Sequence, residues 1–171
     1  MNLLLSDISL PEGLPERKEN HYIDLNRMNI KNCMGCFGCW VKTPGRCVIR
    51  DDAVRIYPLI AHSERLIYVS RLFYGSYDVP MKRMLERAIP IQKAFIRLYH
   101  GETHHVQRDV VPKQAVFIAY GDISAREQDI FRSLVARNAH NMMLSGWDIR
   151  FVPEEAVWET MLSEVRIWEN C

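Results

Sequence analysis

The sequence predicts an α/β fold in which a parallel sheet lies between two layers of helices. Two observations lead to this prediction: apolar runs of strand length recur along the chain, and segments with helical periodicity separate the later ones. Strands that alternate with helices pair in parallel through right-handed crossovers, so the pattern favours a helix–sheet–helix sandwich. The 171 residues, 48% of them apolar, show no second composition regime, and we expect a single domain, residues 1–171.

Five segments are expected to form the strands of this sheet. The first two are short, whereas the other three are longer and rich in β-branched and aromatic residues. In chain order the expected strands are residues 1–6, 21–25, 65–71, 114–121 and 146–152.

Four segments have the spacing of amphipathic helices. The first begins at Asp51 and Asp52, which are expected to cap it, and contains Pro58 as a potential kink. The others have apolar residues three and four positions apart on one face. The expected helices are residues 51–61, 79–88, 125–143 and a last one after Pro153.

Two connections are unusual. The 14 residues 7–20 join the first two strands and include Pro11, Gly13 and Pro15, and a parallel crossover needs about a dozen residues. The first helix is therefore expected to be reduced or absent. Residues 89–112 are predicted to form an irregular polar arm with an assembly or functional role, on which His104 and His105 serve a surface or subunit contact.

Composition excludes several classes of function. Lys and Arg number 22 and Asp and Glu number 21, so no basic field selects nucleic acid or anionic lipid. No apolar run approaches the roughly 20 residues of a membrane span, and the N-terminus lacks a basic signal region. We therefore expect a cytoplasmic protein that binds neither nucleic acid nor membrane. Disulfides are rare in that compartment, so clustered cysteines indicate a metal, a cluster or redox chemistry.

Four of the five cysteines follow one another with the spacing C-x2-C-x2-C-x7-C: Cys33, Cys36, Cys39 and Cys47. The first three converge only if the chain coils as a loop, which Gly35 and Gly38 permit. Bacterial ferredoxin sites share the C-x2-C-x2-C opening, so the spacing favours an iron–sulfur cluster over zinc, which usually pairs two separated C-x2-4-C units. Four reduced cysteines without a metal remain an open alternative. The fifth cysteine, Cys171, is terminal and is expected to fray.

Three stretches, "IKNCMGCFGCWVKTPGRCVIRDD", "LIYVSRLFYGSYDVPMKRMLERAIP" and "GETHH", together resemble the flavodoxin-like flavoproteins, namely the NADPH-dependent FMN reductases and the iron–sulfur flavoproteins. The resemblance implies a five-stranded sheet of order 2-1-3-4-5, with FMN at the carboxyl ends of the strands. It also implies that the loops after the third and fourth strands contact the flavin ring, through Arg71, Leu72, Phe73, Tyr74, Gly75 and Ser76, and through Ala119, Tyr120 and Gly121. In some such proteins the cysteine loop holds a four-iron four-sulfur cluster.

The sequence departs from this family after the first strand. Relatives have a Ser/Thr- and Gly-rich loop there that binds the FMN phosphate at a helix N-terminus. This chain has "SDISLPEGLPERKEN" instead, and the phosphate loop is missing together with its helix.

Three functions follow from these patterns, one of which is a thiol-based or metal-binding protein that uses the cysteine loop without flavin. The first is an NAD(P)H-dependent, FMN-binding oxidoreductase or electron-transfer flavoprotein, which passes electrons to a small molecule or a protein. The alternative is a degenerate binding or assembly module that has lost FMN. The resemblance implies a homodimer or higher homo-oligomer, or pairing with an intact relative. No Ser-His-Asp order or paired-carboxylate spacing is evident, so the sequence assigns no catalytic residue.

Overall fold

The computed structural model describes residues 1–170, and Cys171 lies outside them. Five parallel strands form the central sheet in the order β2-β1-β3-β7-β8. Their bounds are β1 Asn2–Ser6, β2 Asn20–Asp24, β3 Arg65–Phe73, β7 Lys113–Tyr120 and β8 Leu144–Val152. The predicted strands and their 2-1-3-4-5 order are confirmed. A two-residue strand, β4 (Ser76–Tyr77), pairs antiparallel with the end of β3.

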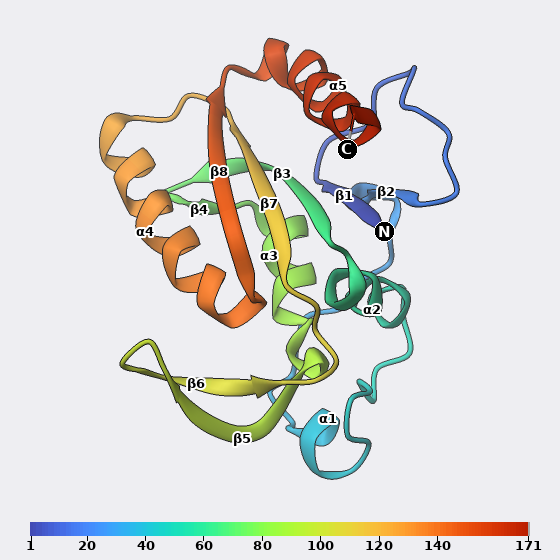
Figure 1. Cartoon of the computed structure of the whole chain (residues 1–171), viewed down its shortest axis with the longest axis vertical. Helices are drawn as coiled ribbons and strands as arrows, with labels where there is room; N and C mark the ends of the chain where they lie inside the picture. The colour runs from blue at the N-terminus through green and yellow to red at the C-terminus, as the bar shows by residue number, and fades with distance from the viewer. Residues whose placement is uncertain (171) are drawn as a thin grey trace.

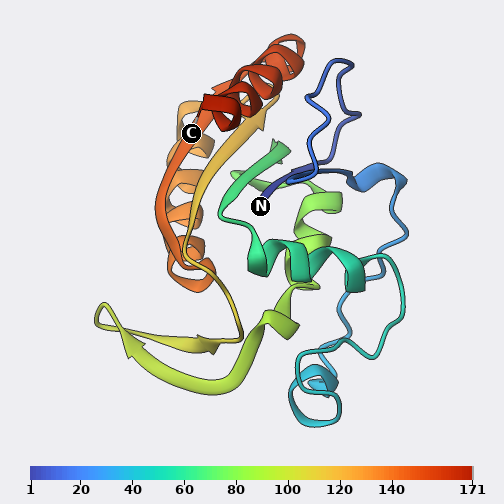
Figure 2. The same ribbon diagram turned by 45° about the vertical axis from the view of Figure 1, so that its right-hand side comes forward.

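Helices cover the two faces of the sheet unequally (Figures 1 and 2). On one face, α2 (Ala53–His62), α3 (Val79–Glu86) and α4 (Ala125–Met142) bury their apolar sides against alternate strand residues such as Leu5 and Tyr68. On the other face α5 (Val157–Ile167) buries Val157, Met161 and Val165. Four short 3-10 turns complete the helical segments: η1 Leu25–Arg27, η2 Ile89–Ile91, η3 Glu154–Ala156 and η4 Trp168–Asn170.

A loop takes the place of the first helix. No helix forms between β1 and β2, as the short crossover predicted. Ile8, Leu10 and Leu14 of this loop instead pack beside α5 onto the sheet, and the Trp158 indole donates to Ser9 O at 2.9 Å. The loop therefore covers apolar strand residues that a helix would otherwise bury.

The arm predicted to be irregular is a β-hairpin. Strands β5 (Gln92–Tyr99) and β6 (Glu102–Gln107) pair antiparallel and form a separate two-stranded sheet. His100 and Gly101 connect them with φ of 50° and 78°, which fits a two-residue hairpin turn. Figures 1 and 2 show the hairpin at the end of the molecule opposite α5, beside the short helix α1 (Gly38–Val41). Within residues 1–170, no helix is both long and apolar enough to cross a membrane.

Candidate functional site

The four cysteines of the loop line one cavity. Cys33, Cys36, Cys39 and Cys47 surround a space of about 40 Å³ whose other walls are mostly apolar, among them Met34, Val48 and Ile89. Cys33 and Cys36 are exposed, whereas Cys39 and Cys47 are half-buried, and all four are free thiols. All four cysteines therefore border the same space.

Local backbone geometry produces this convergence. Gly35 and Phe37 have positive φ of 61° and 54°, which turns the chain between successive cysteines. Gly38 then begins α1, where an added Cβ would lie 2.9 Å from the Val48 side chain. A hydrogen bond from Gly45 N to Cys39 O at 3.0 Å closes the turn that returns the chain toward Cys47. The glycine at position 38 thus allows the two halves of the loop to touch.

Arg87 holds both ends of the cysteine loop. Its guanidinium is buried at the end of α3 and pairs with both oxygens of Asp51, at 2.6 and 2.9 Å. It also donates to Lys31 O at 2.8 Å and to Ile49 O at 3.3 Å, on either side of the cysteines, and lies 3.4 Å from Cys47 Sγ. Burial opposes ionisation of Asp51, but the hydrogen bonds from Arg87 and from Lys31 N–H lower the pKa of that carboxyl. Asp51 thus does more than begin α2, since it anchors the loop through Arg87.

The four sulfurs lie farther apart than the ligands of a single zinc ion. No three of these four sulfurs lie within 4.8 Å of one another. Within residues 1–170, the ligand atoms that do lie this close in a group of three belong to Glu102, His104 and His140. Tetrahedral zinc, with Zn–S bonds of about 2.3 Å, would bring all its sulfurs within about 3.8 Å. A cluster separates its cysteine ligands further. Burial, and secondarily the neighbouring sulfurs Cys47, Cys33 and Cys36, raises the pKa of the Cys39 thiol. A bound cation would offset that cost.

A buried carboxylate directly follows β1, in the stretch where the sequence resemblance implies an FMN phosphate loop. Asp7 follows β1 directly and accepts hydrogen bonds from the Ser70 hydroxyl at 2.7 Å, the Tyr120 hydroxyl at 3.0 Å and the Arg71 backbone N–H at 3.1 Å. Burial raises the pKa of Asp7 to about 6, although these hydrogen bonds lower it. These three hydrogen-bond donors at the edge of the sheet are therefore already paired with the Asp7 carboxyl group.

The predicted flavin-ring residues divide into three groups. Phe73, Tyr74, Gly75 and Ser76 form the tight turn between β3 and β4, where the Phe73 and Tyr74 side chains are exposed and Tyr74 and Gly75 have positive φ. Arg71 pairs with Glu154, and its guanidinium lies 5.3 Å from the centre of the Tyr120 ring. Gly121, with φ of 124°, passes close to the Arg71 side chain. The remaining side chains are buried in the sheet core: Leu72, Ala119 and Tyr120.

FMN fits one half of this edge. The turn at Phe73 and Tyr74 offers aromatic side chains to a ring. The phosphate half does not fit, because no helix N-terminus is present and Asp7 places a carboxyl there. Among the residues described, therefore, no cradle for an FMN phosphate follows β1.

The turn and the cysteine loop lie at opposite ends of α3. The β3–β4 turn precedes the helix, whereas Arg87, next to Cys47, follows it. Eight helical residues span about 12 Å. The cysteine loop therefore lies away from the carboxyl edge of the sheet, near the hairpin (Figure 1).

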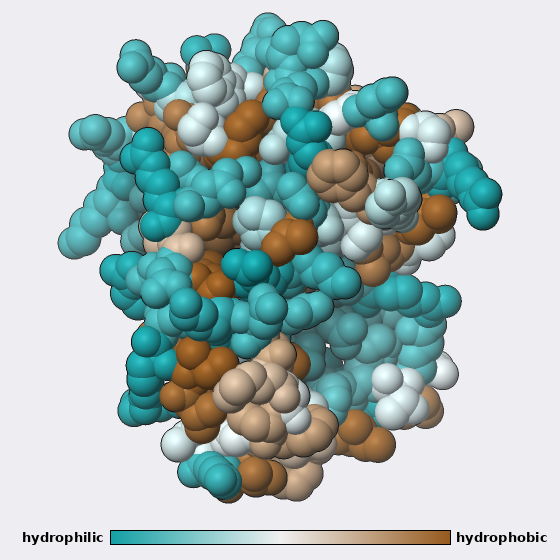
Figure 3. Space-filling view, turned by 180° about the vertical axis from the view of Figure 1, so that it is seen from behind, coloured by the Kyte–Doolittle hydropathy of each residue, from teal (hydrophilic) through white to brown (hydrophobic). Residues whose placement is uncertain are grey.

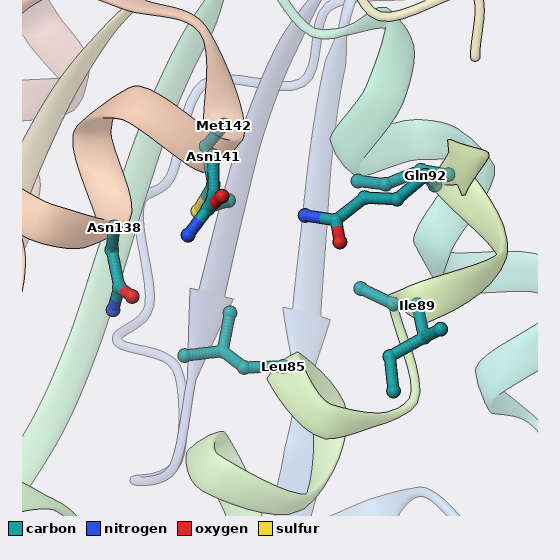
Figure 4. Close-up of a pocket in the computed structure, with 8 residues that line it drawn as sticks. Leu85, Ile89, Gln92, Asn138, Asn141 and Met142 are labelled. Carbon is teal, nitrogen blue, oxygen red and sulfur yellow. The ribbon is translucent and has the colours of Figure 1, made fainter. Parts of the chain in front are cut away.

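A second cavity adjoins the cysteine loop. It has a volume of about 140 Å³ and lies between the ends of α3 and α4, with Ile89 in the wall of both cavities. Asn138 and Asn141 project from α4, and the Gln92 amide faces them from the start of β5 (Figure 4). The cavity thus combines apolar walls with three carboxamides.

Comparisons with known proteins agree with this architecture. A protein of Streptococcus mutans UA159 superposes with a TM-score of 0.59 over all of both chains at 12% identity. An NAD(P)H:quinone oxidoreductase from Methanothermobacter marburgensis gives 0.56 over 97% of this chain and 94% of its own, at 11% identity. An FMN-dependent NADH-azoreductase from Bacillus anthracis str. Ames Ancestor, solved with FMN, gives 0.55 over 98% and 97%, at 12% identity. The chain has the flavodoxin-like fold. The fold that the resemblance implied is thereby confirmed.

One curated relative matches in sequence. An iron–sulfur flavoprotein of Archaeoglobus fulgidus is 31% identical over 84 residues, which are 49% of this chain and 37% of that protein. The match thus spans little more than a third of the relative's length. No protein-family model matches the chain.

Sequence reasoning missed three parts of these sites. In residues 7–20 the sequence predicted the loss of the phosphate loop, but not that Asp7 is a buried hydrogen-bond acceptor. The sequence also assigned no role to Arg87. It also predicted a surface or subunit contact for His104, which is instead buried, 9% exposed, and lies against His140. A charged residue directly after a buried strand was the available signal for Asp7.

Proposed function

We propose that the chain is an electron-transfer protein of the flavodoxin-like class whose cysteine loop holds an iron–sulfur cluster. The observation that carries the proposal is the arrangement of Cys33, Cys36, Cys39 and Cys47 around one cavity, too far apart for a single zinc ion. The match to an iron–sulfur flavoprotein supports it. When bound, such a cluster supplies one-electron transfer at a potential set by its burial and hydrogen bonding.

The protein would shape that potential through its own residues. Arg87 places a buried positive charge 3.4 Å from Cys47 Sγ, and Met34, Val48 and Ile89 contribute apolar walls. A nearby cation favours the more negative, reduced state of a cluster. Arg87 is thus proposed both to position the loop and to raise the potential.

The second part of the proposal is NAD(P)H-dependent flavin reduction. Structural neighbours include an NAD(P)H:quinone oxidoreductase and an FMN-dependent NADH-azoreductase, and the exposed aromatic turn at Phe73 and Tyr74 can contact a flavin ring. Because Asp7 stands at the phosphate position, a flavin is proposed to bind by its ring alone. A small molecule or a protein would accept the electrons.

A binding or assembly module is the second candidate, favoured by the Asp7 site. Exposed apolar side chains support assembly with a second copy or an intact relative: Met34, Phe37 and Val41 on the cysteine loop, and Phe95 and Leu98 on β5. Figure 3 shows apolar residues gathered at that end of the molecule.

Absorption spectra of anaerobically purified protein distinguish the candidates. A cluster gives a broad shoulder near about 400 nm and a flavin gives bands near about 370 and 450 nm. Cys36→Ser is expected to remove the shoulder, and Cys171→Ser, outside the motif, to retain it. Protein that stays colourless after reconstitution with iron and sulfide, and gains no flavin, would leave only the assembly module.

A further inference from the structure

Three potential metal ligands from two distant parts of the sequence meet beside the hairpin. Glu102 and His104 lie on β6, and His140 lies in the last turn of α4. One ligand atom from each lies within 4.8 Å of the others. Glu102 Oε2 is 3.0 Å from His104 Nε2 and 3.3 Å from His140 Nδ1. The site is separate from the cysteine loop and from the β3–β4 turn.

These distances match those between neighbouring ligands of one tetrahedral ion. Bonds of about 2.0 to 2.1 Å from zinc to nitrogen and oxygen place two ligand atoms about 3.3 Å apart. Two imidazoles and one carboxylate are also a donor set that zinc and similar divalent transition metals favour.

The outer contacts orient the ligands. His104 Nδ1 lies 3.0 Å from Asn141 Oδ1, an acceptor, so this nitrogen carries the ring hydrogen and Nε2 presents a lone pair. Arg137 pairs with Glu102 Oε1, which leaves Oε2 for the two histidines. Metal-bound histidines typically donate their second ring nitrogen in this way, and bound carboxylates are themselves hydrogen-bonded.

The space between His104 Nε2 and Glu102 Oε2 requires a positive charge when His104 carries its hydrogen on Nδ1. In the neutral ring the lone pair of His104 Nε2 faces a carboxylate oxygen 3.0 Å away, and neither atom can donate to the other. The His104 side chain is buried, and a proton or a metal ion held between these two atoms satisfies both. When the His140 hydrogen is on Nε2, the His140 Nδ1 lone pair also faces this oxygen, and a metal ion then satisfies all three atoms at once.

We propose that Glu102, His104 and His140 bind a divalent transition-metal ion of the zinc class. Solvent supplies the fourth ligand, since Glu102 and His140 are each about one-third exposed. The ion would fasten β6 to the end of α4. Asn141 contacts His104 and also lines the carboxamide cavity, so the metal would fix one wall of that cavity.

Nuclear magnetic resonance of the imidazoles tests the proposal directly. Long-range proton–nitrogen spectra of the protein, which has six histidines, are recorded while Zn²⁺ is added in excess over the protein. The signals of His104 and His140 are expected to shift together, while those of His21 and His62 stay in place. His140→Gln is expected to weaken this binding at least about tenfold, the loss seen when even an outer contact of a metal ligand is removed. His62→Gln, a change on exposed α2 surface, is the matched control.

Unchanged His104 and His140 signals at saturating Zn²⁺ would overturn the proposal. Glu102 would then be held by Arg137 and by protons on the two histidines, without a metal ion. His104→Gln removes a buried side chain and can impair folding, whereas His140→Gln alters a partly exposed one and remains decisive. The readout depends on neither flavin nor cluster, so it fails independently of the proposed electron transfer.

Discussion

Replacing Asp7 by asparagine tests the buried carboxylate that occupies the phosphate position. The amide keeps an oxygen to accept from Tyr120 and from Arg71 N–H. Its NH2 group can donate to Ser70 Oγ, because the Ser70 hydroxyl also reaches Arg71 O at 2.9 Å. The substitution therefore removes the charge and retains the hydrogen-bond network.

The magnitude follows from the raised pKa of Asp7. A change from the ordinary 3.8 to about 6 corresponds to about 3 kcal/mol, at about 1.4 kcal/mol for each tenfold change in proton affinity. Between these two pH values the folded protein holds more protons than the unfolded chain, so the free energy of unfolding falls as the pH rises through this window. The cost is complete above about pH 6 and absent below 3.8. At neutral pH we expect Asp7→Asn to stabilise the fold by up to about 3 kcal/mol.

Urea unfolding followed by circular dichroism, at about pH 4 and about pH 7.5, measures this effect. The wild-type protein should lose stability between the two pH values relative to Asp7→Asn. Glu12→Gln removes an exposed charge from the same loop and should change stability by less than about 0.5 kcal/mol. An Asp7→Asn protein no more stable than wild type at the higher pH would refute the reasoning.

Three further predictions concern the flavin, the anchor and the loop. Riboflavin should bind at least as tightly as FMN by fluorescence titration, and Asp7→Asn should shift the ratio toward FMN; a clear wild-type preference for FMN would contradict the missing phosphate site. Arg87→Met leaves Asp51 buried without its partner and should lower the free energy of unfolding in urea by about 3 to 5 kcal/mol. Arg83→Met, the control, loses a single hydrogen bond to a backbone carbonyl and should lower it by about 1 kcal/mol. Gly38→Ala places a methyl group 2.9 Å from Val48 and should at least halve iron uptake; unchanged uptake would show that the loop does not need this contact.

The sequence predicted the sheet well because its strands are continuous apolar runs. Residues 66–70 and 117–120 are buried, so side chains on both faces of these strands are covered, and burial of that kind leaves a strong local signal. The hairpin was missed for the opposite reason. Apolar and polar residues do not alternate along β5, and its apolar side chains Phe95, Ile96 and Leu98 are exposed. Only the His100–Gly101 turn indicated a hairpin.

The candidate sites were predictable only where their residues are neighbours in the chain. The cysteines converge within one loop, and their spacing with two glycines was enough to predict this. Arg87 reaches that loop from another helix, and His140 meets His104 only through the packing of α4 on the hairpin. Contacts of this kind depend on tertiary structure, for which a single sequence carries no local pattern.

Iron and acid-labile sulfide content of the anaerobically reconstituted protein tests the central claim most directly. A cluster on Cys33, Cys36, Cys39 and Cys47 predicts about four iron and four sulfide per chain, lost in Cys36→Ser and kept in Cys171→Ser. Uptake of about one zinc per chain that Cys36→Ser abolishes, in place of iron and sulfide, or no metal at this loop, would contradict the claim.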